Sequence, residues 1–374
     1  MLDQFEVVAE EQFNQKPDNL QQLWHFTRKD GDIRCIGHVI NIAIQAALAT
    51  LKAIPAEETE VYRMVYQSAV LPHEYDRTDI ISTLYKLRRY IYIFRNRRIW
   101  RDALEKQCKV ANITYYRLGL DMPVRWNSIY NIIKGACNLQ IPITAVCAIQ
   151  DYDTSVRALI LTQADWSILE NIQKLFRIFI RPSQKLQGKV YPTMNYAIPQ
   201  YLQLLNKLEL LRTAFGSNTT LGKACTSAYD KLYEYYLLIR KQSYGSVATI
   251  CDPRFNLNVF QNLWPSPISS SNRNRVRTQF IDVFTLYENR ERTIQAEYID
   301  DSTTINAIME DPESDSESDL FKPRNAIDFE TEYSKWIKQQ PMPRDTDILR
   351  YWASKEYEFP IVARMARDHL AIPA

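Results

Sequence analysis

Glycine is scarce in this sequence, and its scarcity excludes several kinds of site. The chain of 374 residues holds 8 glycines, about 2% against a usual share of about 7%. Loops that cradle phosphates need closely spaced glycines, because the backbone must turn sharply and approach the ligand. The nearest pair, Gly216 and Gly222 followed by Lys223, has one residue too many between its glycines, and Ala224 stands where a magnesium-binding Ser or Thr is expected. The sequence therefore indicates no nucleotide-binding loop.

Other signatures are also missing. No G-x-S-x-G or H-E-x-x-H motif occurs, which excludes the commonest hydrolase and metalloprotease sites. No apolar run approaches the roughly 18 residues that a membrane span needs, so we expect no membrane partner. We recognise no signal peptide, and we expect scattered, reduced and mostly buried thiols in an intracellular protein. The cysteines are Cys35, Cys108, Cys137, Cys147, Cys225 and Cys251.

Charge is unevenly distributed along the chain. Nine of its 44 acidic residues lie in residues 297–319, a stretch without Lys or Arg, whereas the whole chain has 46 Lys and Arg. A dense acidic run with few aromatic residues is typical of a disordered linker, and its serines could also be phosphorylated. Outside this stretch the chain is basic, which is compatible with nucleic acid or another polyanion as a partner.

Apolar residues recur at the spacing of packed helices through most of the chain. We expect one helix after Cys35, and a second that starts at a capping pair, Thr162 and Asp165, and stops at Pro182. Other helices are expected from about Pro199 and beyond, with only short strands, such as residues 247–251. The expected core positions include Val39, Ile40, Ala43, Ala47, Trp166, Leu169, Ile172, Phe176, Phe179, Leu202, Leu205, Leu208, Leu232, Tyr236, Phe280, Phe284 and Tyr287.

Three short helices are expected after the acidic stretch. Trp336 marks the first, Asp345 can cap the second, and Pro360 lies in the first turn of the third, which runs to Leu370. A unit of about 45 residues is too small to be very stable alone. We therefore expect it to pack on the body of the same chain or on a second copy.

Three local patterns could bind a ligand. Cys35 and His38 have the C-x-x-H spacing of a zinc half-site, but a structural zinc ion needs four ligands, so we favour a packed helix start with His38 hydrogen-bonded inside the fold. In a second pattern, aromatic residues alternate with cations. These cations could contact phosphates, or they could form the solvated face of an amphipathic helix. Those cations are Lys86, Arg88, Arg89, Arg95, Arg97, Arg98 and Arg101.

The third pattern is Arg125 followed by Trp126. An Arg-Trp pair can hold a phosphate and stack on an unpaired base, whereas a Trp at a helix start alone is more often part of the core. The residues predicted to bind DNA are Arg95, Arg97, Arg98, Arg125 and Trp126.

Several segments together resemble the hAT superfamily of DNA transposases, in its fungal branch. The resemblance spans nearly the whole chain, with the blocks in the family's order. Residues 34–41 resemble the R-C-x-x-H-x-x-N-L block, and residues 124–128 resemble the T-R-W-N-S block, with Val124 in place of Thr. The helix and turn that follow in the family are similar to residues 161–166 and 185–188, and the K-x-x-x-Y-Y and D-P-R-x-K blocks are similar to residues 235–236 and 252–255. The C-terminal dimerisation region resembles residues 351–352, 359–360 and 363–373. Asn256 or Leu257 stands where the D-P-R-x-K block has Lys.

The resemblance implies a mainly α fold, with a partial RNase H-like α/β core interrupted by a large all-helical insertion domain. The implied division is 1–58 for the remnant of the core, 59–295 for the helical insertion, 296–325 for the acidic linker and 326–374 for the dimerisation region. It also implies a nuclear location and self-association. The residues that we expect to form the dimer are Trp352, Phe359, Ile361, Met365 and Leu370.

The family cuts and joins DNA with three acids, Asp, Asp and Glu, and magnesium or manganese. Only Asp3 fits one of these positions, with Gln4 in place of the family's Asn, so we expect at most one of the three acids. Loss of one metal-binding acid normally abolishes two-metal catalysis. We therefore predict no strand transfer and no cofactor for this chain alone.

The leading hypothesis is a transposase-derived, catalytically inactive protein that self-associates and binds DNA without sequence specificity. One alternative is a metal-dependent DNA transposase of which this chain is an incomplete fragment. Another is a host-adopted interaction protein that forms mixed dimers with related transposases and represses them.

Overall fold

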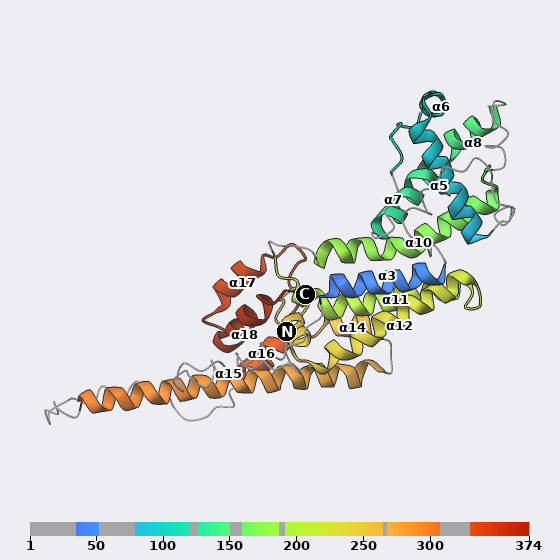
Figure 1. Ribbon diagram of the computed structural model, residues 1–374. Helices are drawn as coiled ribbons and strands as arrows, with labels where there is room; N and C mark the ends of the chain where they lie inside the picture. Colours follow the sequence, from blue (N-terminus) through green and yellow to red (C-terminus); the bar gives the residue numbers. More distant parts are fainter. Residues whose placement is uncertain are drawn as a thin grey trace, which may run out of the picture. The chain divides into compact units, whose positions relative to one another are not determined.

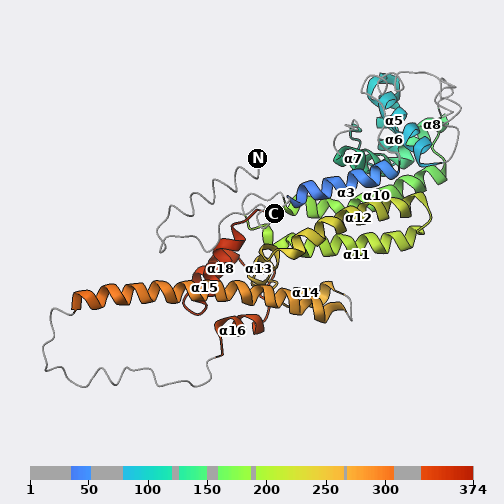
Figure 2. The same ribbon diagram turned by 60° about the horizontal axis from the view of Figure 1, so that its bottom comes forward.

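A computed structural model describes the chain in separate segments, in which the regular elements are helices and no strand occurs (Figures 1 and 2). The described residues are 35–51, 79–119, 126–149, 159–186, 191–264, 268–306 and 330–373. The predicted mainly α class is confirmed for these residues. Most of residues 1–58, where we expect the RNase H-like remnant, lies outside them.

The described residues form two compact units. The bundle unit holds those of residues 36–187 and 203–235, and the C-terminal unit holds Cys35 with those of residues 188–202 and 236–374. The predicted boundary between residues 58 and 59 lies outside the described residues. The predicted linker from residue 296 begins inside the long helix α15 (Ile268–Asn306), a sequence without proline or glycine to stop it.

The bundle unit is arranged around helix α10. Its elements are α3 (Ile36–Thr50), α5 (Ile80–Asn96), α6 (Arg98–Val110), α7 (Trp126–Asn138), α8 (Gln140–Ile149), α10 (Gln163–Leu186) and most of α11 (Ala197–Phe215) and α12 (Thr220–Lys241). Helix α10 packs on α3, α5 and α7, while α6 packs on α5 and α8. Figures 1 and 2 both show α3 alongside α10.

The predicted apolar stripes of α3 and α10 face this core. All their central positions are buried to 2% exposure or less: Val39, Ile40, Ala43, Ala47, Trp166, Leu169, Ile172, Phe176 and Phe179. Burial of each large aliphatic or aromatic side chain stabilises the unit by about 1.5–3 kcal/mol. His38 is exposed in the first turn of α3, so our expectation that it lies inside the fold was wrong. It lies off the apolar stripe, where no core residue surrounds it.

The predicted start of α10 is confirmed. Thr162 donates its main-chain N–H to a carboxylate oxygen of Asp165 at 2.9 Å, and Asp165 donates its own N–H to the Thr162 hydroxyl at 3.2 Å. The same carboxylate accepts from the hydroxyl of Thr83 at 2.6 Å and lies 3.5 Å from Lys86, which ties α10 to α5. Burial alone would raise the pKa of Asp165, but these hydrogen bonds and Lys86 outweigh it and hold the pKa below its usual value. Lys86 is thus part of the core.

Helix α10 does not stop at Pro182, contrary to the prediction. Proline removes one helical hydrogen bond and clashes with the preceding turn, yet α10 continues to Leu186. Pro182, Ser183 and Leu186 are all buried. Their tertiary packing outweighs the local preference, which a sequence pattern cannot show.

The Gly216 and Gly222 pair forms the turn between α11 and α12. Gly216 has a positive φ of 86°, which favours glycine. A Cβ atom on Gly222 would lie 2.1 Å from the carbonyl oxygen of Gly216. The glycines therefore serve a close backbone approach, in agreement with the absence of a phosphate-loop pattern.

The cysteines are free thiols, as predicted, and four of the six are buried. Burial raises the pKa of Cys137 and of Cys225 to about 11. Thiols with such a pKa are protonated and unreactive at neutral pH.

The C-terminal unit is arranged around α13 (Tyr244–Ile250). Its other elements are η3 (Met194–Tyr196), the first residues of α11, the last residues of α12, α14 (Val259–Leu263), α15, α16 (Glu332–Lys338), α17 (Ile348–Lys355) and α18 (Pro360–Leu370). Helix α13 packs on η3, α15 and α18, and α18 also packs on α15, α16 and α17. Three short helices after the acidic stretch are therefore confirmed.

The prediction of a short strand at residues 247–251 was wrong, because α13 covers most of it. The hydroxyls of Ser246 and Thr249 donate back to the carbonyls of Ser243 and Gly245, at 2.8 and 2.7 Å. Every residue of the segment is buried. Local side-chain bonds and burial therefore override the strand preference of the β-branched residues.

Candidate dimerisation surface

Two tryptophans of the C-terminal helices donate hydrogen bonds to main-chain carbonyls at the end of α13. Trp336 of α16 donates its indole N–H to the carbonyl oxygen of Ile250 at 3.2 Å. Trp352 of α17 donates to the carbonyl oxygen of Cys251 at 2.9 Å. The centroids of the two indole rings lie 4.7 Å apart. Carbonyls at a helix end have no partner within the helix, so the indoles satisfy them where water is excluded.

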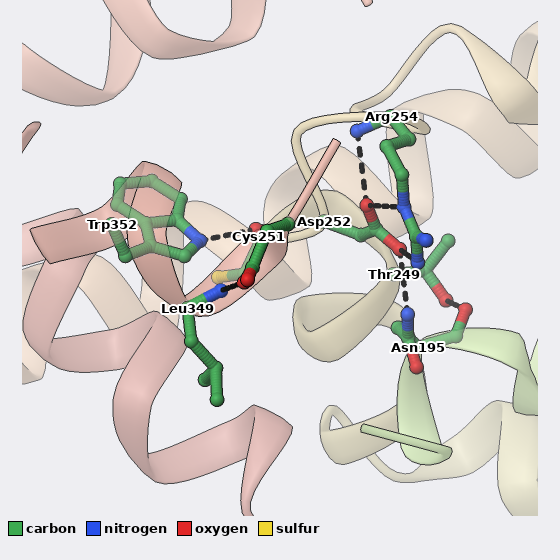
Figure 3. A network of polar contacts seen from close by, with 8 residues as sticks. Asn195, Thr249, Cys251, Asp252, Arg254, Leu349 and Trp352 are labelled. Carbon is green, nitrogen blue, oxygen red and sulfur yellow. Dashed lines mark hydrogen bonds and ion pairs between the residues drawn. The ribbon is translucent and has the colours of Figure 1, made fainter. Parts of the chain in front are cut away.

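Asp252, the next residue, is the centre of a buried polar cluster (Figure 3). Its carboxylate, fully buried, accepts from Asn195 of η3 at 2.6 Å and from the guanidinium of Arg254 at 2.7 and 2.9 Å. Thr249 donates to the carbonyl oxygen of Asn195 at 3.1 Å. Burial alone would lower the pKa of Arg254, but Asp252 outweighs it and holds the pKa above its usual value. The cluster fixes the loop on which the C-terminal helices rest.

Asn256 explains why the D-P-R-x-K resemblance fails at its last position. Its φ is 49°, in the left-handed region that Asn tolerates better than other non-glycine residues. Its side-chain amide donates to the carbonyl oxygens of Trp336 and Gln339, at 2.8 and 3.3 Å. It is 1% exposed, with little room for a charged lysine head. The position thus joins the loop to the end of α16.

Glu332 of α16 caps the start of α18. Its carboxylate accepts the main-chain N–H of Val362 at 2.7 Å. The first N–H groups of a helix lack partners within it and favour a negative charge. Burial raises the pKa of Glu332 above its usual value, although these main-chain hydrogen bonds partly oppose the rise. In the next helix Asp347, and not the predicted Asp345, is the N-cap, because its carboxylate accepts from Leu349 N at 3.0 Å and Arg350 N at 3.2 Å.

A groove of about 740 Å³ opens on the surface of these helices. Its apolar lining comes mainly from α17, α18 and the residues after α18, with Tyr191 at one side. Its lining includes the apolar and aromatic residues Tyr191, Leu349, Ala353, Ala363, Leu370 and Ile372. Its volume is within the range of about 300–1,000 Å³ typical of binding pockets.

Large apolar side chains stand exposed at this groove. Leu349 is 65% exposed and Tyr191 is 44% exposed. Tyr357 follows the groove residue Glu356 in the chain and is fully exposed at 101%, although it does not line the groove. Exposed apolar side chains that gather around a hollow mark interaction surfaces more often than isolated ones do.

The structure buries most of the residues that we predicted to form the dimer. Trp352, Phe359, Met365 and Leu370 are between 0 and 7% exposed, and Ile361 is half-buried. Trp352 and Leu370 also line the groove. The sequence prediction missed Leu349 as a site residue, because periodicity separates buried from exposed positions and does not separate exposed positions that a partner contacts from those that water contacts.

The residues predicted to bind DNA have different surroundings. Arg95 is half-buried and donates to the carbonyl oxygen of Leu118. Burial and the nearby Arg117 lower its pKa. Arg97 and Arg98 are exposed, and Arg98 lies 3.4 Å from the Asp102 carboxylate.

The remaining predicted site residues lie at or beyond the edge of what the structure describes. Trp126 is the first residue of α7, and its side chain is outside the described part, as are Arg125 and Asp3. In the described segments no three His, Cys, Asp or Glu side chains come together as metal ligands.

The architecture of the C-terminal helices has a counterpart among known families. Residues 332–374 match the hAT family C-terminal dimerisation region. This segment is similar in sequence to the hAT dimerisation region. The matched residues contain α16, α17, α18 and most of the groove lining, and the predicted resemblance to the hAT superfamily is confirmed.

Similar proteins support the same assignment. The chain is 20% identical over 351 residues to the zinc finger BED domain-containing protein RICESLEEPER 3 of Oryza sativa, covering 91% of this chain and 41% of the relative. It is 22% identical over 351 residues to tpeD of Talaromyces stipitatus, named as a transcriptional regulator, covering 91% and 37%. It is 21% identical over 267 residues to DAYSLEEPER of Arabidopsis thaliana, covering 68% and 35%. The chain thus spans about two-fifths of the length of these relatives. No helix in the described part is long and apolar enough to cross a bilayer.

Proposed function

We propose that this transposase-derived chain self-associates by apposing the groove faces of two copies. The observation that carries the proposal is the hAT dimerisation region at residues 332–374, together with the groove and the exposed Leu349 and Tyr357. Most closed protein dimers are twofold, so the same patch of each copy contacts the other. In such an arrangement the protruding side chains of one copy enter the groove of its partner.

In the proposed dimer, most of the five residues first predicted to form it stabilise the fold of the C-terminal unit because they are buried. Trp352 and Leu370 are buried side chains that line the groove, and Phe359 and Met365 are buried in the same unit without lining it. Their replacement by alanine would disturb the fold itself. Replacement of an exposed residue that lines the groove, such as Leu349, therefore tests the interface without disturbing the fold.

Light scattering of the purified chain at several concentrations and at high salt tests the proposal. We expect a mass of two copies for the wild type and one copy for Leu349→Asp, because the buried charge has no partner at an apolar interface. Ser354→Asp is the matched control: it adds the same charge to the same helix at an exposed position that does not line the groove. A monomeric wild type would overturn self-association, whereas a dimer that tolerates Leu349→Asp would overturn the groove as its interface.

We infer that the chain alone does not carry out strand transfer. Of the family's three acids the sequence supplies a counterpart for at most one, Asp3. The alternative is that the chain is a fragment of a metal-dependent transposase. Incubation of the chain with a transposon-end duplex and Mn²⁺ separates these views, since joined products would contradict the inference.

We also propose that residues 1–58 are a remnant of an RNase H-like core, that the protein is nuclear, and that it forms mixed dimers with related transposases. The confirmed hAT region supports all three by family likeness alone. Co-expression with a full-length relative in a transposition assay tests mixed dimers. Unimpaired transposition would count against them.

We further propose that the basic body of the chain binds DNA without sequence specificity. The excess of Lys and Arg outside the acidic stretch supports the proposal. Arg97 and Arg98 are exposed, and Arg125 and Trp126 remain predicted contacts. If Trp126→Ala leaves the affinity for DNA unchanged at low salt, the Arg-Trp pair is not a contact.

A further inference from the structure

On several helices of the described residues, exposed cations lie beside acids. Ion pairs at i,i+3 or i,i+4 join Arg98 to Asp102, Lys109 to Glu105, Lys231 to Glu234, Arg292 to Glu288, Arg350 to Asp347 and Lys355 to Glu358. Such pairs support a helix by a few tenths of a kcal/mol and leave little net charge on its face.

Helix α10 departs from this arrangement. From Asn171 to Leu186 it contains no Asp or Glu, and Lys174, Arg177 and Arg181 are all exposed. Lys174 donates only to Asn171 at 3.2 Å. Glu170, one turn before Lys174, is the nearest acid of the helix, and no carboxylate of the described residues lies within ion-pair distance of Lys174, Arg177 or Arg181.

The three cations form one line along the helix. At 3.6 residues per turn, positions 174, 177 and 181 fall within about 60° of one another, and they span about 10 Å along the axis. The opposite face, with Leu175, Phe176 and Phe179, is buried in the bundle core. The line thus points outward from its own unit. We call Lys174, Arg177 and Arg181 the α10 cation line.

We propose that the α10 cation line is a contact site for the phosphate backbone of duplex DNA. Phosphates of one strand advance about 3.4 Å each along the duplex axis, so a cation line of about 10 Å is long enough to lie beside several of them. Arginine and lysine both bind phosphate oxygens, arginine in a bidentate manner. This inference rests on the proposed DNA binding of the basic body and assigns it to residues that the sequence motifs did not single out.

Fluorescence anisotropy with a labelled duplex of about 20 base pairs tests the site. We expect Arg177→Gln/Arg181→Gln to weaken binding on the order of tenfold at 50 mM salt, and to lower the slope of log affinity against log salt by about 1.8, the value for two lost phosphate contacts. Arg177→Lys/Arg181→Lys keeps both charges and should retain most of the affinity. Because both side chains are exposed, the melting temperature should not change.

Lys109→Gln/Lys231→Gln is the matched control. Both lysines lie in the same unit, both are exposed, and each is paired with a glutamate, so the double variant loses the same net charge with an expected change below about twofold. A wild type that does not bind the duplex would overturn the proposed DNA binding as a whole. A wild type that binds, with equal losses in the two double variants, would overturn the α10 cation line and leave DNA binding intact.

Discussion

The indole N–H of Trp352 lies 2.9 Å from the main-chain carbonyl oxygen of Cys251, a residue 101 positions earlier in the chain. Trp336 makes the same kind of bond to the neighbouring Ile250. The hAT dimerisation region therefore rests on the end of α13 through two buried hydrogen bonds and two large apolar rings. Removal of either ring should loosen the region from α13.

Trp336 gives the sharper test because it is 1% exposed and does not line the groove. We expect Trp336→Ala to cost about 3–5 kcal/mol in the free energy of unfolding, from lost burial and the cavity left behind. Trp336→Phe keeps most of the ring and should cost less, with about 1 kcal/mol attributable to the lost hydrogen bond. Urea unfolding followed by circular dichroism measures both. Equal costs for the two variants would show that the hydrogen bond, and not packing, dominates.

The Asp252 and Arg254 pair should be strongly coupled. Asp252 is fully buried, and the Arg254 side chain is 15% exposed. We expect Asp252→Asn to cost about 3–5 kcal/mol, because it leaves a largely buried guanidinium without its carboxylate. Arg254→Met in the Asp252→Asn background should recover part of that loss. A double-mutant cycle by urea unfolding measures the coupling, and additive costs would contradict it.

The sequence predicted those features of the fold that depend on local pattern. The stripes of α3 and α10 and the capping pair Thr162 and Asp165 repeat within a few residues, so helical periodicity and capping rules apply directly. The segment at residues 247–251 and the expected stop at Pro182 were wrong for one reason. In both places burial against distant elements outweighs the local preference.

The candidate site was less predictable than the fold. The motifs located the C-terminal region, and Trp352 and Leu370 do line its groove. Leu349 could not be selected, because its place in the groove follows from how α17 and α18 pack together. The role of Asn256 at the left-handed turn could not be predicted from the sequence either, because the residues whose carbonyls it contacts follow it by 80 positions or more.

Asn256 should be replaceable by glycine at a smaller cost than by alanine. Both changes remove the hydrogen bonds to Trp336 and Gln339, but only glycine adopts a φ of 49° without strain. We expect Asn256→Ala to be less stable than Asn256→Gly by about 1–2 kcal/mol, the usual cost of the left-handed conformation. Thermal unfolding of the two variants gives the difference. The reverse order would mean that the turn relaxes in the variants.

His369 should make the C-terminal unit less stable in mild acid. The side chain is 1% exposed, and its Nδ1 lies 2.9 Å from the carbonyl oxygen of Met365, with the rings of Tyr244 and Tyr287 nearby. Burial lowers the pKa of His369 below its usual value near 6.5, although Asp368 partly opposes this. Below pH 6.5 the unfolded chain therefore takes up a proton that the folded chain does not, and stability falls as the pH falls.

The measurement is the free energy of unfolding in urea at several pH values between 5 and 7.5, at one protein concentration. We expect the wild type to lose stability below pH 6.5 with an added slope of up to about 1.4 kcal/mol per pH unit. His369→Asn keeps a polar group near the Met365 carbonyl but does not titrate there, so it should lack that added slope. Carboxylates contribute equally to both proteins and cancel in the comparison. Parallel curves for the two proteins would show that His369 accepts its proton inside the fold, which its burial against the rings of Tyr244 and Tyr287 opposes.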